Sequence, residues 1–218
     1  MKYRYKNLST EKLYNNGDFK SNIVESFIKN HNEIYESLIK NSKKINKASN
    51  ILQDTYLNGG RIFFIGAGTS GRLGVMEAAE MPPTFGVESE KFIGLIAGGR
   101  KALTVAAEGA EDRGELAIDE LNKYNFNKKD FLVGISASGT SDYVLSALRK
   151  AKKMKSKNIL LSCNKPKVKI SDLDIILKVG PEILAGSTRL KSGTITKIAL
   201  NIITCLLYTS DAADESSS

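Results

Sequence analysis

The spacing of apolar residues divides the chain into two parts. Up to Asn58 the sequence is polar, with isolated apolar side chains at intervals near three, four and seven residues, and Asn58-Gly59-Gly60 then ends the pattern. Such spacing places the apolar side chains on one face of a helix, so it predicts amphipathic helices. The residues on that face are Ile23, Phe27, Ile34, Leu38, Ile45 and Leu52.

From Arg61 onward, short apolar runs alternate with helical segments. The predicted strands cover residues 61–66, 91–97, 130–136, 158–163 and 174–179. These runs lack the polar alternation of strands with one solvated face, so they predict an α/β fold with a parallel five-stranded sheet flanked by helices. A last helix is expected over 190–204. Ligands bind such sheets at the carboxyl ends of the strands, so function is expected in the loops that follow them.

Composition and charge exclude several classes of function. No apolar run approaches the roughly 18 residues that span a bilayer, and the N-terminus lacks the apolar core of a signal peptide, so we expect a cytoplasmic protein without a membrane segment. The net charge of +8 does not indicate nucleic-acid binding, because 25 of the 32 basic residues are scattered lysines without interleaved aromatic residues. Two cysteines and one histidine predict neither a disulfide framework nor a metal site.

The C-terminal stretch differs from the rest of the sequence. Residues 205–215 back-translate into DNA that resembles a transposon-type sequencing adapter read in frame, and three serines follow. The alternative is an ordinary frayed C-terminus. We expect residues 205–218 to be adapter-derived and the native reading frame to be truncated after Thr204.

The loop after the first predicted strand matches the spacing GxGxxG in residues 66–71. A dinucleotide site is disfavoured, because the second strand runs into Ala-Gly-Gly and lacks the expected acidic residue. A triphosphate P-loop is disfavoured because Arg72 stands where lysine is required. A tight turn that needs glycine is the alternative to a function. The sequence favours a phosphate site at a helix N-terminus, formed by Gly68, Thr69, Ser70 and Arg72.

Two further clusters offer hydrogen-bond donors at the same end of the predicted sheet as this phosphate site. Ser136, Ser138, Gly139 and Thr140 follow the third strand, where a serine-rich helix cap is the alternative. Ser187, Arg189 and Lys191 lie just before or at the start of the last predicted helix.

Carboxylates are sparse near these loops. Glu80 lies in the helix after the first loop, which Pro82 and Pro83 are expected to end, and Glu111 lies in an acidic turn. Both are ordinary surface or capping carboxylates, or they divide general acid and general base chemistry between them.

Several motifs together carry a family resemblance. Residues 60–86, 94–99, 106–112, 134–139 and 186–194 resemble the N-acetylmuramic acid 6-phosphate etherases of the sugar isomerase (SIS) domain superfamily, and Leu8-Ser9-Thr10-Glu11 is similar to that family's start. The resemblance implies a flavodoxin-like three-layer SIS domain over 59–204, an N-terminal helical region over 1–58, and a homodimer when the protein is full length.

The resemblance also implies a reaction. Members cleave the D-lactyl ether of N-acetylmuramic acid 6-phosphate, giving N-acetylglucosamine 6-phosphate and D-lactate without a cofactor or metal. By motif, Glu111 is expected to be the base at C2 and Glu80 the acid that protonates the departing lactate. The alternatives are a non-catalytic sugar-phosphate-binding regulatory domain and, less favoured by the motifs at 81–86 and 108–112, an aldose–ketose isomerase. A truncated chain is expected to fold incompletely or to be inactive.

Overall fold

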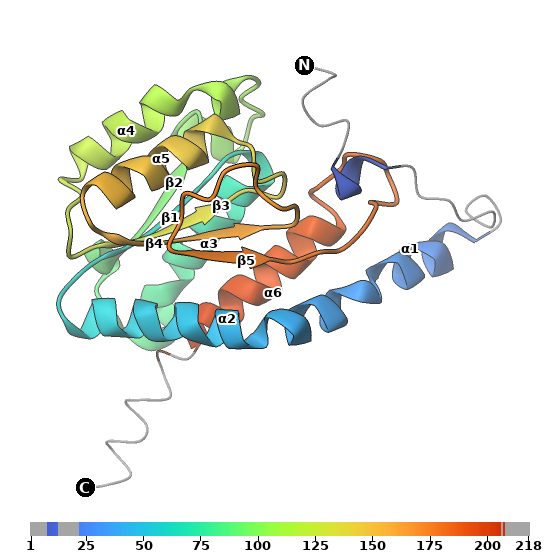
Figure 1. The fold of residues 1–218 in the computed structure, drawn as a ribbon, viewed down its shortest axis with the longest axis horizontal. Helices are drawn as coiled ribbons and strands as arrows, with labels where there is room; N and C mark the ends of the chain where they lie inside the picture. The colour runs from blue at the N-terminus through green and yellow to red at the C-terminus, as the bar shows by residue number, and fades with distance from the viewer. Residues whose placement is uncertain (1–7, 13–21, 206, 208–218) are drawn as a thin grey trace, which may run out of the picture.

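A five-stranded parallel sheet forms the centre of the computed structural model, which describes residues 8–12, 22–205 and 207. The order of strands across the sheet is β2-β1-β3-β4-β5, and every neighbouring pair is parallel (Figure 1). The strands are β1 (Ile62–Gly66), β2 (Phe92–Ile96), β3 (Phe131–Ile135), β4 (Lys157–Ser162) and β5 (Leu173–Ile176). The predicted sheet is therefore confirmed, although β5 ends three residues earlier than the sequence predicts.

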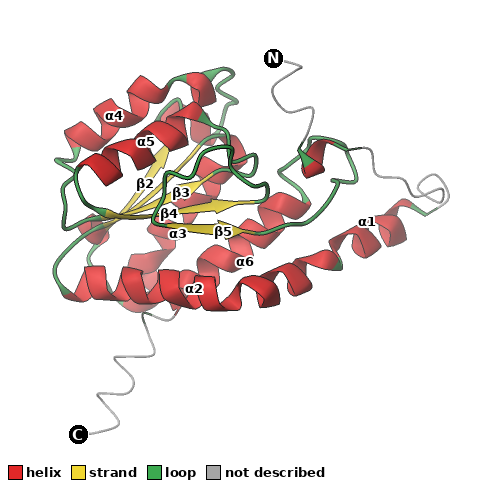
Figure 2. Ribbon diagram, in the orientation of Figure 1, coloured by secondary structure: helices red, strands yellow, loops and turns green. Residues whose placement is uncertain are grey.

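Helices cover both faces of the sheet (Figure 2). Those described are α1 (Ile23–His31), α2 (Glu33–Leu57), α3 (Gly68–Phe85), α4 (Gly114–Lys123), α5 (Asp142–Lys153) and α6 (Lys191–Cys205). Short 3-10 helices are η1 (Ser9–Glu11), η2 (Ser89–Lys91), η3 (Arg100–Leu103) and η4 (Ala110–Asp112). Helices α2, α3 and α6 pack on one face, and α4 and α5 on the other. Within the described residues, no helix is long and apolar enough to cross a membrane.

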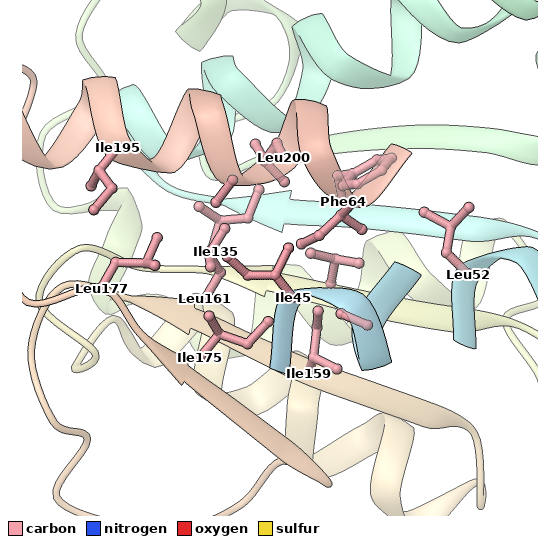
Figure 3. Packing of buried hydrophobic residues seen from close by; sticks show 14 of the residues in the cluster. Ile45, Leu52, Phe64, Ile135, Ile159, Leu161, Ile175, Leu177, Ile195 and Leu200 are labelled. Carbon is pink, nitrogen blue, oxygen red and sulfur yellow. The ribbon is translucent and has the colours of Figure 1, made fainter. Parts of the chain in front are cut away.

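The larger core lies between the sheet and the helices α2, α3 and α6. Phe64 of β1 and Leu161 of β4 meet Leu52 of α2 and Leu200 of α6 there, and each of these side chains is buried (Figure 3). A second core on the opposite face joins Phe63 to α4 and α5. The strands are buried on both faces, which explains why they read as continuous apolar runs.

The predicted N-terminal helical stripe is buried over only part of its length. Ile34, Leu38, Ile45 and Leu52 are buried, and all four belong to α2. Ile23, by contrast, is 59% exposed. The helix is interrupted at Asn32, and α1 extends beyond the edge of the sheet, where no strand is available to cover its apolar side chains (Figure 1).

The expectation that Pro82 ends its helix is wrong. Helix α3 contains both Pro82 and Pro83 and continues to Phe85, where Gly86 closes it in the left-handed conformation. The fixed φ of proline is compatible with a helix, and the Gly86 amide donates to the Pro82 carbonyl in the last turn.

The C-terminal residues fall partly outside the described structure. Cys205 is the last residue of α6, and Leu207 packs into the larger core. The other residues of 205–218 lie outside the described residues, so their origin from an adapter stays a prediction.

Two leucines of α2 offer a matched test of how this helix is held. We predict that Leu52→Ala lowers the free energy of unfolding by about 2–5 kcal/mol, because Leu52 is fully buried against the sheet. Leu57→Ala should change it by about 0.5 kcal/mol or less, since Leu57 is 64% exposed. Urea denaturation followed by circular dichroism measures both, and equal losses would contradict this packing.

Candidate functional site

A cleft of about 630 Å³ opens at the carboxyl ends of the strands. Strands β1 and β3 are neighbours there, but α3 leaves β1 toward one face of the sheet and α5 leaves β3 toward the other. The loops after the two strands therefore separate and leave a crevice between them. Its walls come from both loops, from residues 102–111, and from two segments described below.

The first loop brings the N-terminus of α3 to the cleft. A side chain on Gly71 would lie 2.6 Å from the Gly66 carbonyl oxygen, so glycine is needed for this close approach of strand and helix. Gly68, Thr69, Ser70 and Arg72 all line the cleft. The Arg72 Nε donates to the Leu103 carbonyl at 2.9 Å, which fixes the guanidinium at the cleft wall.

The second loop arranges its hydroxyl groups around Ser138. The Ser138 hydroxyl accepts from the Thr140 amide at 3.2 Å and from the Thr140 hydroxyl at 3.0 Å, while the Gly139 amide donates to the Ser136 hydroxyl at 3.1 Å. Ser136 and Ser138 line the cleft, whereas Gly139 and Thr140 do not. The hydrogen bonds from Gly139 and Thr140 therefore orient the two serine hydroxyls before any ligand binds.

The third cluster only partly reaches the cleft. Gly186 and Thr188 line it, but the expected residues Ser187, Arg189 and Lys191 do not. The Lys191 side chain is buried, and its Nζ lies 3.4 Å from a carboxylate oxygen of Glu33.

A protein carboxylate already occupies the N-terminus of α6. Glu182, which is fully buried, accepts from the backbone amides of Lys191 and Ser192 at 3.0 and 2.9 Å and from the Ser192 hydroxyl. The positive end of α6 is thus neutralised by Glu182 and is not directed at the cleft.

The two predicted catalytic carboxylates lie in different places. Glu111 lines the cleft, and the Ser141 hydroxyl holds its backbone carbonyl at 3.2 Å. Glu80 is exposed on α3 and does not line the cleft. It follows Ser70 by ten residues of helix, which corresponds to about 15 Å along the axis. One chain therefore brings Glu111, but not its own Glu80, to the cleft.

The cleft also contains acidic residues that sequence reasoning did not select, Glu11 and Glu108. Burial raises the pKa of Glu11, and the negative charge of Glu182 adds to the increase. Glu11 belongs to η1, far from the other cleft residues in sequence. The signal that could have identified it is the similarity of residues 8–11 to a family start.

Comparison with protein families and curated sequences finds related proteins over most of the chain. Residues 43–152 match the family described as "Glucokinase regulatory protein N-terminal SIS domain". An N-acetylmuramic acid 6-phosphate etherase of Staphylococcus saprophyticus is 48% identical over 75% of this chain and 56% of its own length. One from Staphylococcus epidermidis is 54% identical over 68% of this chain and 51% of its own. The chain spans about half the length of the curated relatives it matches.

Solved structures share the fold at low sequence identity. The phosphoheptose isomerase GmhA from Neisseria gonorrhoeae is 14% identical, with a TM-score of 0.62 over 88% of this chain and 99% of its own. The Vibrio vulnificus NanR protein complexed with ManNAc-6P is 16% identical, with a TM-score of 0.58 over 92% of this chain and 70% of its own. The fold is therefore that of a sugar isomerase domain.

The hydroxyl network predicts how the cleft binds an anion. Ser138→Ala should weaken the binding of inorganic phosphate about tenfold or more, because it removes a donor to the anion and the acceptor that orders Thr140. Isothermal titration calorimetry measures the affinity. Ser89→Ala, an exposed serine before β2, is the matched control and should bind as the unaltered chain does. An unchanged affinity in Ser138→Ala would place the anion elsewhere.

Proposed function

We propose that the cleft of this chain binds a sugar 6-phosphate and that the protein cleaves the D-lactyl ether of N-acetylmuramic acid 6-phosphate. The reason is that the chain belongs to the SIS-domain family. By its identity to curated relatives, it also belongs to the N-acetylmuramic acid 6-phosphate etherases. The products are N-acetylglucosamine 6-phosphate and D-lactate. The chain spans only about half of its relatives, so this activity is proposed for the whole protein.

The observation that carries this proposal is the pairing, in one cleft, of two hydroxyl-bearing loops with a carboxylate. Thr69, Ser70, Ser136 and Ser138 offer donors to a phosphate at the junction of β1 and β3, where the N-terminus of α3 favours negative charge. Glu111 lies in the wall of the same cleft. A sugar bound through its 6-phosphate would thus lie beside a carboxylate able to accept a proton.

The elimination can be derived from these groups. In the open-chain aldehyde, the carbonyl at C1 acidifies the proton at C2, and Glu111 accepts that proton. Electrons of the C2–H bond form a C2–C3 double bond as the C3–O bond breaks, and an acid protonates the departing lactate oxygen. Water then adds at C3, while C2 regains a proton. Both proton transfers are within the capacity of carboxyl groups.

The position of Glu80 decides which chain can supply the acid that protonates the departing lactate. By motif, Glu80 is the group expected to protonate lactate, yet it is exposed on α3 and lies outside the cleft of its own chain. We propose that the protein acts as a homodimer in which Glu80 of one copy serves the cleft of the other. In such a dimer, each site joins Glu111 and Glu80 from different chains.

Release of D-lactate from N-acetylmuramic acid 6-phosphate by the full-length protein tests the function directly. We expect lactate, measured with D-lactate dehydrogenase, together with incorporation of solvent deuterium at C2. Sugar-phosphate binding without lactate release would instead favour a non-catalytic regulatory domain, the alternative that the position of Glu80 outside the cleft supports. Absence of binding would contradict both.

We predict that Glu111→Gln abolishes deuterium incorporation at C2, because a neutral amide cannot accept the proton. Mass spectrometry of the recovered sugar phosphate measures this exchange. Glu90→Gln, an exposed carboxylate on η2, is the control and should leave the exchange unchanged. Continued exchange in Glu111→Gln would assign the base to another group.

Mixing two inactive variants tests the shared site. Glu80→Gln and Glu111→Gln should each lose lactate release by at least about a hundredfold, in line with the loss of a general acid or base. After mixing and subunit exchange, the heterodimer should regain up to half of the wild-type activity, since one of its two sites has both carboxylates. No recovery despite demonstrated exchange would argue that each chain uses its own Glu80.

A further inference from the structure

The short helix η1 is fastened across one side of the cleft. Asn164, which follows β4, accepts from the Ser9 amide and hydroxyl at 3.0 and 2.9 Å, and its own amide donates to the Thr10 hydroxyl and to the Ala137 carbonyl. Ala137 belongs to the second hydroxyl loop. The buried Asn164 therefore holds η1 in a fixed position relative to the second hydroxyl loop.

A second attachment joins η1 to the loop before α6. The Gly186 amide donates to the Thr10 carbonyl at 3.1 Å, and Thr10 is fully buried. Gly186 has a φ of +77°, and a side chain on it would lie 2.5 Å from the Glu11 carboxylate oxygen. Glycine at this position thus gives the Glu11 carboxyl the space it occupies in the cleft wall.

Among the described residues, the Glu11 carboxyl takes no part in the hydrogen bonds that fasten η1. The hydrogen bonds that fasten η1 run through Ser9 and Thr10, and Glu11 lines the cleft. The nearby charges are those of Glu182 behind it and of Arg72, Glu108 and Glu111 around the cleft. Partial burial disfavours the charged form of Glu11 and so raises its pKa, and a ligand that supplies a donor would stabilise that charged form.

The cleft is therefore divided by hydrogen-bonding character. The loops after β1 and β3 present the hydroxyl groups of Thr69 and Ser138, which can donate to a phosphate. The wall formed by η1 presents Glu11, whose ionised carboxyl can only accept. A sugar phosphate has the complementary division, with an anion at one end and hydroxyl and amide donors at the other.

We propose that Glu11 is a specificity-determining residue, which accepts a hydrogen bond from a hydroxyl or amide group of the sugar and so distinguishes a sugar phosphate from phosphate alone. This inference rests on the proposed function for the identity of the ligand class. It assigns to the N-terminal segment a direct part in binding, separate from the proton transfers of Glu111 and Glu80.

Calorimetric titration of the chain with N-acetylglucosamine 6-phosphate and with inorganic phosphate tests this role. Glu11→Gln should weaken the sugar phosphate about tenfold and leave inorganic phosphate unchanged, because a charged acceptor is replaced by a neutral one. Glu90→Gln is the matched surface control. The thermal unfolding temperature of Glu11→Gln should stay close to that of the unaltered chain, because Ser9 and Thr10 keep their bonds.

The pH dependence separates a direct contact from a structural effect. Burial and Glu182 raise the pKa of Glu11 above its ordinary 4.5. The ionised form is the acceptor, so the ratio of sugar-phosphate to phosphate affinity should increase as the pH rises through this raised pKa and then level off. The second phosphate proton is lost at a lower pH from a sugar phosphate than from inorganic phosphate, so the ratio for the unaltered chain is divided by that for Glu11→Gln, in which this contribution is the same. The quotient should keep the increase that comes from Glu11, and Glu11→Asp should show the same increase at lower affinity.

Each other outcome overturns the assignment. Equal affinities of Glu11→Gln and the unaltered chain for the sugar phosphate would remove Glu11 from the binding site. An equal loss of affinity for both ligands would show that the substitution acts on the second hydroxyl loop instead. If the unaltered chain bound neither ligand, the proposed function would fail together with this inference. Binding with the expected pattern but no lactate release by the full-length protein would overturn only the proposed reaction.

Discussion

The pairing of β1 with β3 is the constraint on which the cleft depends. Both strands end at the same edge of the sheet, and the helices that follow them turn to opposite faces. The two hydroxyl loops therefore line the same cleft from different sides, and the backbone path alone creates the space between them. The close contact between Gly66 and Gly71 lets α3 begin directly against the end of β1. Displacing either strand would separate groups that are more than sixty residues apart in sequence.

Local sequence patterns are sufficient to predict the sheet and two of the three clusters that were expected to line the cleft. Parallel strands buried on both faces appear as apolar runs, and hydroxyl-rich turns after them point to the carboxyl edge. Both signals are contained in short windows. This is why the sequence alone points to residues 66–72 and the serines at 136 and 138 as candidate site residues.

The residues whose position the sequence does not predict depend on interactions between distant segments. Lys191 is adjacent to hydroxyl residues in the sequence, yet the buried Glu182 binds its backbone amide and Glu33 attracts its side chain away from the cleft. Glu11 lies more than fifty residues before the first strand and reaches the cleft because Asn164 and Gly186 hold the neighbouring Ser9 and Thr10. Pairing of this kind depends on tertiary contacts that no periodicity records. Helix α1 is a similar case, because its apolar stripe predicts burial but no strand lies beneath it.

The packing of α2 against α6 has a consequence for the order in which the chain can fold. These helices come from opposite ends of the described chain, cover the same face of the sheet, and are joined by the Ser49 hydroxyl, which donates to the Ile203 carbonyl at 2.6 Å. During synthesis on a ribosome, the opposite face can be covered as soon as α5 has emerged. The face that α2 shares with α6 closes only when α6 has left the exit tunnel, so the apolar residues of α2 must stay protected from aggregation while the five strands and α6 are being made.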